Sequence, residues 1–248
     1  MAKFRVGQTV YAPIYRYPRG DQAYYAIARG PVRAIIGRSC EVDLPTIGPR
    51  KIAFSHLHAE LGVCIVRIGD FTSEQSVMDP ICKSVLHFLR LLLPDDHLRL
   101  VELRTEAELE EFFDIYASLY SFWIVIGHGT KQGELCFTRG RRRPARELAA
   151  SLKSSASAPR TFLFLSCNAG LAAFAKPFSS ESQLCHALIA PIGALHSAVA
   201  SQFAQTFLSY LYLEGLSIGV AFNKATEKVP TSTRFRLWKK GKFFRKGG

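Results

Sequence analysis

The first seventy residues consist of short apolar, β-branched and aromatic runs separated by turn-forming residues. The runs are FRVGQTVYAPI, AYYAIARGPVRAIIG, SCEVDLP, RKIAF and GVCIVRIGD. Runs of this length bounded by Gly and Pro predict strands, and no helical period competes with them. Because the strands are short and closely spaced, we expect residues 1–70 to form a small all-β barrel.

From about residue 76, after the polar boundary Asp70–Ser76, helical and strand patterns alternate. Asp79–Leu93 carries apolar residues at helical spacing, and the run LRLVELR that follows is typical of a strand. Thr105, with Glu108 three residues later, predicts the capped start of a helix. This rhythm predicts that residues 76–230 form an α/β domain with a mostly parallel sheet flanked by helices.

The second half of the chain continues this rhythm. Thr161–Leu165 is apolar or β-branched throughout, which predicts a strand buried on both faces. The elements expected after it are a loop over Leu171–Ser182, a helix over Glu181–Ala190, a strand over Ile189–Ala194, a long helix after His196 and a last helix over Ser217–Val229.

Two predicted strands end in residues that suit a catalytic site. The run SFWIVIGHGT ends with His128 between two glycines, and TFLFLSCNAG ends with Cys167 in a turn of small residues. Neighbouring parallel strands bring their carboxyl ends together, at the edge where open α/β sheets bind ligands. Cys167 would supply a thiolate nucleophile, His128 would manage the proton, and the N–H groups of Gly129 and Cys167 would face the oxyanion. In the competing interpretation Cys167 is only a small buried hydrophobe.

The Gly-His-Gly and Ser-Cys-Asn-x-Gly motifs together resemble those of caspase-like cysteine peptidases, most closely the CHAT branch. The resemblance covers Asp79–Val229, and Ile192–Val229 is similar to the end of a CHAT domain. It implies a caspase-like α/β fold and a peptidase that uses His128 and Cys167 on a protein substrate, without metal or organic cofactor. It also implies an effector in prokaryotic antiviral defence or cell death, switched by an activating partner protein. The animal caspase signature Q-A-C-x-G is not met, so a preference for Asp is not implied.

The N-terminal runs carry a second resemblance. VGQTVYAP and GPVRAIIGRSCEVDL are similar to the opening strands of SH3-type barrels. This resemblance implies a binding or docking module, while a packing module without a ligand is the alternative.

Composition adds constraints on location and partners. The 248 residues carry a formal charge of +12, which favours acidic partners such as nucleic acid or an anionic surface. Six cysteines without a C-x-x-C pair predict reduced thiols and a cytoplasmic protein. No apolar run reaches the ~20 residues that span a bilayer, and the N-terminus lacks the pattern of a secretory signal, so no transmembrane segment is expected.

The positive charge is concentrated in two segments. Arg139–Arg146 is either a solvated loop, a phosphate-binding patch or a cleavage site. Residues 231–248 alternate basic and aromatic side chains, either in a strand pair that turns at Gly241 or in a tail that binds RNA, single-stranded DNA or an anionic membrane. Two hypotheses follow: a cysteine endopeptidase of open specificity, or a non-catalytic nucleic-acid- or anionic-surface-binding module with a vestigial peptidase fold.

Overall fold

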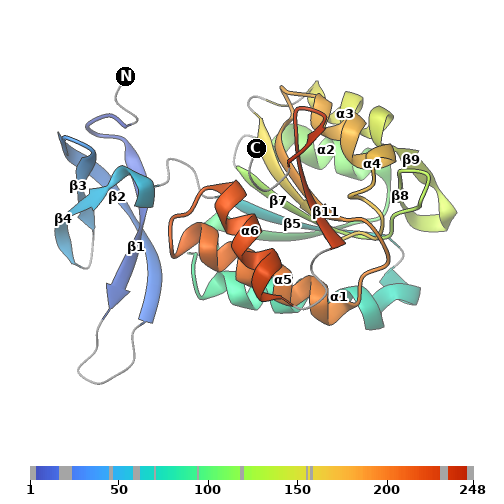
Figure 1. Ribbon diagram of the computed structural model, residues 1–248, viewed down its shortest axis with the longest axis horizontal. Coiled ribbons are helices and arrows are strands. Elements are labelled where there is room, and N and C mark those ends of the chain that lie inside the picture. The colour runs from blue at the N-terminus through green and yellow to red at the C-terminus, as the bar shows by residue number, and fades with distance from the viewer. Residues whose placement is uncertain are drawn as a thin grey trace.

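The computed structural model contains a small N-terminal sheet and a larger sheet covered by helices on both faces (Figure 1). It describes residues 4–16, 24–44, 47–57, 62–69, 71–93, 95–117, 120–154, 156, 159–229 and 234–244. Among the described helices, none combines the length and the apolar composition that a bilayer-spanning segment requires.

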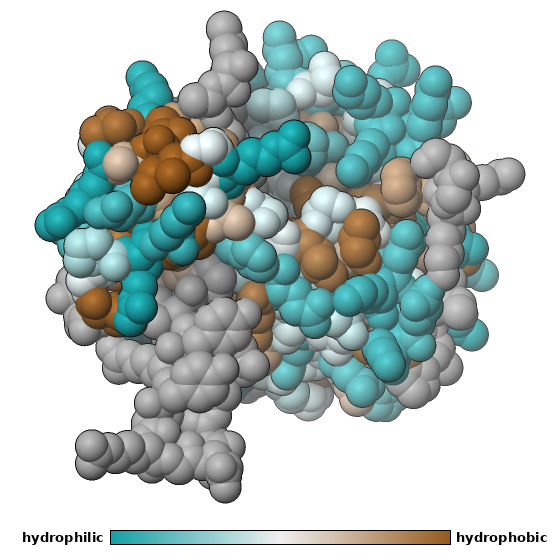
Figure 2. Space-filling view, turned by 60° about the vertical axis from the view of Figure 1, so that its left-hand side comes forward, coloured by the Kyte–Doolittle hydropathy of each residue, from teal (hydrophilic) through white to brown (hydrophobic). Residues whose placement is uncertain are grey.

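The N-terminal sheet is antiparallel, with its strands paired in sequence order. The strands are β1 (Thr9–Arg16), β2 (Tyr24–Ile36), β3 (Ser39–Leu44) and β4 (Gly48–Ala53). Phe4, Val10, Val42 and Leu57 are buried in its core. Within the described ranges β1 and β4 form the two edges and do not pair, so the antiparallel strands are as expected while closure into an SH3-like barrel stays a prediction. In the view of Figure 2, the surface of the N-terminal sheet is largely hydrophilic around a small group of hydrophobic residues.

Within the described ranges, the larger sheet has seven strands in the order β13-β12-β11-β10-β7-β5-β6. The strands are β5 (Val63–Ile68), β6 (Leu98–Leu103), β7 (Phe122–Ile126), β10 (Arg160–Phe164), β11 (Cys185–Pro191), β12 (Phe235–Lys239) and β13 (Lys242–Phe243). The pairs among β5, β6, β7, β10 and β11 are parallel, whereas β12 and β13 pair antiparallel at one edge. The mostly parallel sheet predicted from the sequence is confirmed.

The assignment of the run GVCIVRIGD to the N-terminal barrel is wrong. Its strand, β5, lies inside the larger sheet between β7 and β6. All six residues of β5 are buried, which requires helices on both faces, and only the larger sheet provides them. The division of the chain into domains stays a prediction.

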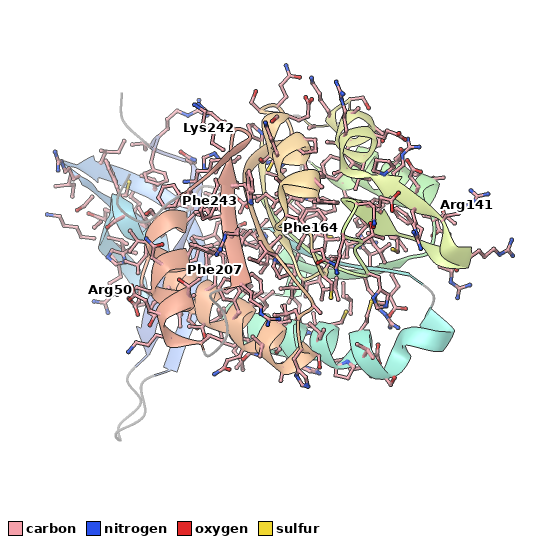
Figure 3. The ribbon with its side chains drawn as sticks, turned by 45° about the vertical axis from the view of Figure 1, so that its right-hand side comes forward. Arg50, Arg141, Phe164, Phe207, Lys242 and Phe243 are labelled. Atoms are coloured by element: carbon pink, nitrogen blue, oxygen red, sulfur yellow. The ribbon has the colours of Figure 1, made fainter. Side chains whose placement is uncertain are left out.

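Among the described residues, α-helices cover both faces of the larger sheet (Figure 1). One face carries α1 (Phe71–Arg90), α5 (Ser197–Tyr212) and α6 (Ile218–Lys228), and the other α2 (Glu106–Tyr116), α3 (Ala145–Lys153) and α4 (Ala172–Ser180). Strand residues alternate between the two cores, so that Leu163 packs with the first group and Phe164 with the second. In Figure 3 Phe207 of α5 and Phe164 both lie in the interior. Short elements complete the fold: β8 (Glu134–Cys136), β9 (Arg142–Pro144), and 3-10 turns at Phe54–His56, Asp95–His97 and Thr138–Gly140.

Two expectations after Cys167 are wrong. The loop expected over Leu171–Ser182 is the helix α4, whose Phe174 and Phe178 pack on the sheet despite Pro177 inside the helix. The helix expected over Glu181–Ala190 is instead strand β11, hydrogen-bonded between β10 and β12. Its apolar residues face both helix layers, which a strand in this position can do and a surface helix cannot.

The basic, aromatic C-terminal segment forms the strand pair that was one of its two interpretations. β12 and β13 turn at Lys240 and Gly241, whose φ angles of 50° and 70° are the left-handed values of a tight hairpin. The Gly241 N–H donates to Ser179 Oγ of α4 at 3.2 Å. The hairpin therefore packs on the larger sheet and on α4.

The N-terminal sheet lies beside the larger sheet at the end where the parallel strands begin (Figure 1). Tyr11 of β1 hydrogen-bonds His97 at 3.1 Å, directly before β6 starts at Leu98. Gly215, after the end of α5, lies against the backbone of Ser55. The described residues of the N-terminal sheet lie away from the opposite end of the larger sheet, where the parallel strands end (Figure 1).

Candidate functional site

The pairing register of β7 and β10 brings the two candidate catalytic residues together. The strands pair in parallel from Phe122 with Thr161 to Val125 with Phe164, and the Leu165 N–H donates to the Val125 carbonyl at 2.8 Å. Continued at the same offset, this register sets Cys167 beside His128. The prediction that their strands are neighbours is confirmed, while their catalytic roles stay a prediction.

The backbone at Gly129 touches the backbone at Cys167. A Cβ atom at position 129 would overlap the Cys167 carbonyl oxygen, so only glycine allows this close approach. Gly170 approaches the Ala190 carbonyl in the same way. The loops after β7, β10 and β11 are therefore packed against one another with little freedom to move apart.

The turn that carries Cys167 is fixed by hydrogen bonds to the next loop. The Asn168 N–H donates to the Gly193 carbonyl at 3.2 Å, and the Gly170 N–H donates to the Pro191 carbonyl at 2.7 Å. Asn168 has a φ of 63°, a left-handed value that Asn tolerates better than most residues. Trp238 of β12 donates its indole N–H to the Gly170 carbonyl at 3.1 Å. The C-terminal hairpin thus supports the cysteine turn directly.

The segment that carries His128 is fixed by β8. The Cys136 N–H donates to the His128 carbonyl at 2.9 Å, and the Thr130 N–H donates to the Glu134 carbonyl at 3.0 Å. The Thr130 hydroxyl also donates to the Glu134 carboxylate at 3.0 Å. The backbone at His128 is held by β8 on one side, and the adjoining Gly129 contacts the Cys167 backbone on the other, while His128 itself is exposed.

Two N–H groups at the candidate site are available to a ligand. In the described part of the chain, neither the Gly129 N–H nor the Cys167 N–H donates to a protein acceptor. Gly129 and Leu135 form an antiparallel bridge whose hydrogen bonds run between the residues that flank them, from Thr130 to Glu134 and from Cys136 to His128. The bridge therefore leaves the Gly129 N–H without a bond to Leu135. Unpaired N–H groups beside a thiol are the donors that a developing oxyanion requires.

Cys167 differs from most other cysteines in exposure. Cys167 and Cys136 are partly exposed, whereas Cys40, Cys64, Cys82 and Cys185 are buried. Burial raises the pKa of the Cys82 thiol to about 12 and raises the pKa of the Cys64 and Cys185 thiols as well. Those buried thiols stay protonated and unreactive at neutral pH.

Sequence reasoning missed two polar residues near this edge. Ser166 is fully buried, and its hydroxyl has no hydrogen-bond partner among the described residues, as would suit a group satisfied by water or substrate. Arg67 is 2% exposed at the end of β5 and forms ion pairs with Asp79 at 2.6 Å and Glu102 at 2.8 Å. The signal for Arg67 was a single charge in an apolar run. No cluster of three or more metal-ligating side chains occurs in the ranges that the structure describes.

The fold has counterparts among solved structures. The chain is similar to a secreted C11 cysteine protease from Bacteroides thetaiotaomicron, solved with an irreversible peptide inhibitor, with a TM-score of 0.50 and 10% identity. The match covers 73% of this chain and 66% of that protease, so the chain spans slightly less than two thirds of it. The fold is caspase-like. A second similarity, to Saccharomyces cerevisiae separase in its complex with securin, has a TM-score of 0.45 at 12% identity over 72% of this chain and 12% of separase.

Comparison by sequence found no relative. No protein-family model matches the chain, and no curated protein matches it. The similarity to the C11 cysteine protease therefore establishes the caspase-like fold alone, and the CHAT branch stays a prediction. On this fold, a partly exposed thiol, an exposed imidazole and two unpaired N–H groups lie at the carboxyl ends of adjacent strands. The chemistry that such an arrangement can perform is acyl transfer.

Proposed function

We propose that the protein is a cysteine endopeptidase with His128 and Cys167 as its catalytic pair. The parallel pairing of β7 and β10, together with the backbone contact of Gly129 with Cys167 in the loops that follow them, carries this proposal. The unpaired N–H groups of Gly129 and Cys167 at the same place support it. The caspase-like fold, shared with a cysteine protease, is consistent with it.

The reaction divides into two acyl transfers. The Cys167 thiolate attacks the carbonyl carbon of the scissile peptide bond, and the N–H groups of Gly129 and Cys167 hold the oxyanion. The His128 imidazolium gives its proton to the leaving amine, and the C–N bond breaks. His128 then takes a proton from a water molecule, which hydrolyses the thioester and frees Cys167.

The substrate is a protein, and the biological role is that of a regulated effector in prokaryotic defence or cell death. A partner protein that activates the enzyme is part of this proposal. The N-terminal sheet is the region suited to receive such a partner, because it contacts the larger sheet where the parallel strands begin, away from the loops that follow β7 and β10 (Figure 1).

Matched cysteine variants test the proposal. Wild-type protein, Cys167→Ala, His128→Ala and Cys136→Ala are incubated with a peptide library and with an electrophilic peptide probe. Cys136 is the control because it is the other partly exposed thiol. We expect cleavage and probe labelling to be lost in Cys167→Ala and cleavage to be lost in His128→Ala, while Cys136→Ala retains both. Cleavage by Cys167→Ala or by His128→Ala would refute the assignment.

A non-catalytic anion-binding module is the second candidate, and one observation favours it. Lys176, Lys239, Lys240 and Lys242 gather around the tip of the C-terminal hairpin, and none forms an ion pair with a described carboxylate. Burial, together with the charges of Lys239 and Lys240, lowers the pKa of the neighbouring His186. The aromatic side chains there are engaged in packing, which weakens the case for base stacking: Trp238 contacts Phe243 and donates to Gly170. Salt-sensitive RNA binding without probe labelling of Cys167 would select this candidate.

A further inference from the structure

Arginines of the basic segment Arg139–Arg146 line a cavity at the same sheet edge as His128 and Cys167. The cavity measures about 390 Å³ and is lined by Arg104, Thr105, Glu108, Thr138, Arg139 and Arg141. We call it the arginine cavity. It lies where β6 ends and α2 begins, and β6 is parallel to β5 and β7, so the cavity opens at the carboxyl edge of the sheet.

Short contacts connect the arginine cavity to the backbone at His128. Cys136, whose N–H donates to the His128 carbonyl, pairs with Arg142 across the β8–β9 hairpin. The turn of this hairpin closes through the Phe137 N–H, which donates to the Arg141 carbonyl at 2.8 Å. The turn is anchored on β6 by the Thr138 N–H, which donates to the Arg104 carbonyl at 3.0 Å. One hairpin therefore positions both the His128 backbone and the arginines.

Ion pairs within the described residues do not neutralise the positive charges of Arg139 and Arg141. Arg143, in an adjoining cavity, pairs with both Glu106 and Glu147 and is neutralised there. Arg139 and Arg141 are exposed and form no ion pair with any described carboxylate. Glu108 is the one acid in the lining, and the N–H groups of Arg104 and Thr105 already occupy its carboxylate at 2.6 and 3.0 Å.

The backbone at Arg139 is unusual. Its φ of 56° is left-handed, which is uncommon for a residue other than Gly, Asn or Asp. The neighbouring Gly140 is also left-handed, with a φ of 69°, so the turn does not rely on glycine alone. Side chains held in such conformations cluster at ligand-binding positions. This conformation supports a role for Arg139 in binding.

We propose that the arginine cavity binds carboxylate side chains of an acidic segment in the protein substrate, away from the bond that is cleaved. This inference rests on the proposed peptidase function. Arginine matches carboxylates because its planar guanidinium donates two parallel hydrogen bonds. A nucleic acid fits less well, because the neighbouring ring of Phe137 is buried and, among the described residues, no aromatic ring lines the cavity for a base to stack on.

Binding is tested with the full chain made inert by Cys167→Ala, so that chemistry does not enter. The probes are a fluorescent glutamate-rich peptide, its glutamine counterpart and a single-stranded RNA. The variant is Arg139→Gln with Arg141→Gln, and the control is Arg50→Gln with Lys51→Gln, which removes the same charge from β4. Figure 3 shows Arg50 and Arg141 at opposite ends of the molecule.

We expect the glutamate peptide to bind and the glutamine peptide not to bind. The Arg139/Arg141 variant should weaken this binding about tenfold at low salt, the combined effect of two exposed ion pairs, and the difference should shrink as salt is added. The Arg50/Lys51 control should bind as the parent does. Equal weakening in both double variants, no weakening in either, or preferential binding of RNA would overturn the inference.

A cleavage arm separates this inference from the proposed function. Wild-type protein should cleave peptides that carry flanking glutamates with a higher kcat/KM than their glutamine counterparts, and the Arg139/Arg141 variant should lose that preference. Cleavage indifferent to glutamate would remove the inference and leave the peptidase intact. Specific peptide binding by a chain that never cleaves would refute the catalytic assignment and reduce the cavity to a binding site.

Discussion

Replacing Gly129 with alanine tests the contact on which the candidate site depends. The added Cβ atom would overlap the Cys167 carbonyl oxygen and would lie 3.7 Å from the Glu134 carbonyl oxygen. To restore a normal van der Waals contact, the loops that carry His128 and Cys167 must separate by about 1 Å. Overpacking of this kind costs about 1–3 kcal/mol of folding free energy. A displacement of about 1 Å between reacting groups reduces a catalytic rate by roughly 100-fold.

The assay combines denaturation with the reaction of Cys167 toward an electrophilic peptide probe, and Gly193→Ala is the matched control. Gly193 lies on the neighbouring loop, and the one atom of the described residues that a Cβ atom there would meet is Arg234 Nη1 at 3.8 Å. We expect Gly129→Ala to fold with reduced stability and to react roughly 100-fold more slowly, and Gly193→Ala to stay within about 0.5 kcal/mol and near the parent rate. If Gly129→Ala reacts as fast as Gly193→Ala, the two loops do not form one site and the reasoning fails.

Three further predictions concern the supports of this edge. Arg67→Met removes the buried cation that Asp79 and Glu102 share, while Asp79 keeps its ion pair with Lys83. The loss of two charge-assisted hydrogen bonds should cost about 2 kcal/mol of unfolding free energy in urea titration, and an unchanged midpoint would contradict this. Hydrogen bonds from the backbone at Arg104 and Thr105 lower the pKa of Glu108, so its stabilisation is complete above the usual Glu pKa and is lost as pH falls through the folded value. The melting temperatures of wild type and Glu108→Gln should therefore differ at neutral pH and converge in acid. Trp238→Phe removes the bond to the Gly170 carbonyl and should cost about 1 kcal/mol and slow the probe reaction, whereas an unaffected rate would mean that the hairpin does not support the cysteine turn.

The sequence allowed the strands of the site to be predicted because their pattern is local. Phe122–Ile126 and Arg160–Phe164 are buried throughout, and each is followed by small residues that permit a tight turn. The capping box at Thr105 and Glu108 was also local, and the structure forms both of its hydrogen bonds. Features of this kind depend on neighbours a few residues away, which a sequence displays directly.

Features set by distant neighbours escaped prediction. The apolar run of β11 suits a buried strand and a buried helix equally well, and only its pairing with β10 and β12 decides between them. Pro177 and the serines around it favoured a loop, yet the ring of Phe178 packs 5.0 Å from that of Phe162 and holds α4 on the sheet. The ion pairs of Arg67 join β5, α1 and β6, three elements that no local pattern connects.

The parallel register explains why separate chemistries collect at separate edges of this molecule. His128, Cys167 and the arginine cavity all follow strands that run in one direction, so they share the carboxyl edge. β12 runs antiparallel to β11, which carries the lysines at the tip of the hairpin to the opposite edge, where the N-terminal sheet also contacts the fold through Tyr11 and His97. An anionic ligand of the lysines and an acidic substrate of the arginines would therefore not compete. Single-stranded RNA added at low salt should leave the binding of a glutamate-rich peptide unchanged, and competition between the two would mean that they share one basic surface.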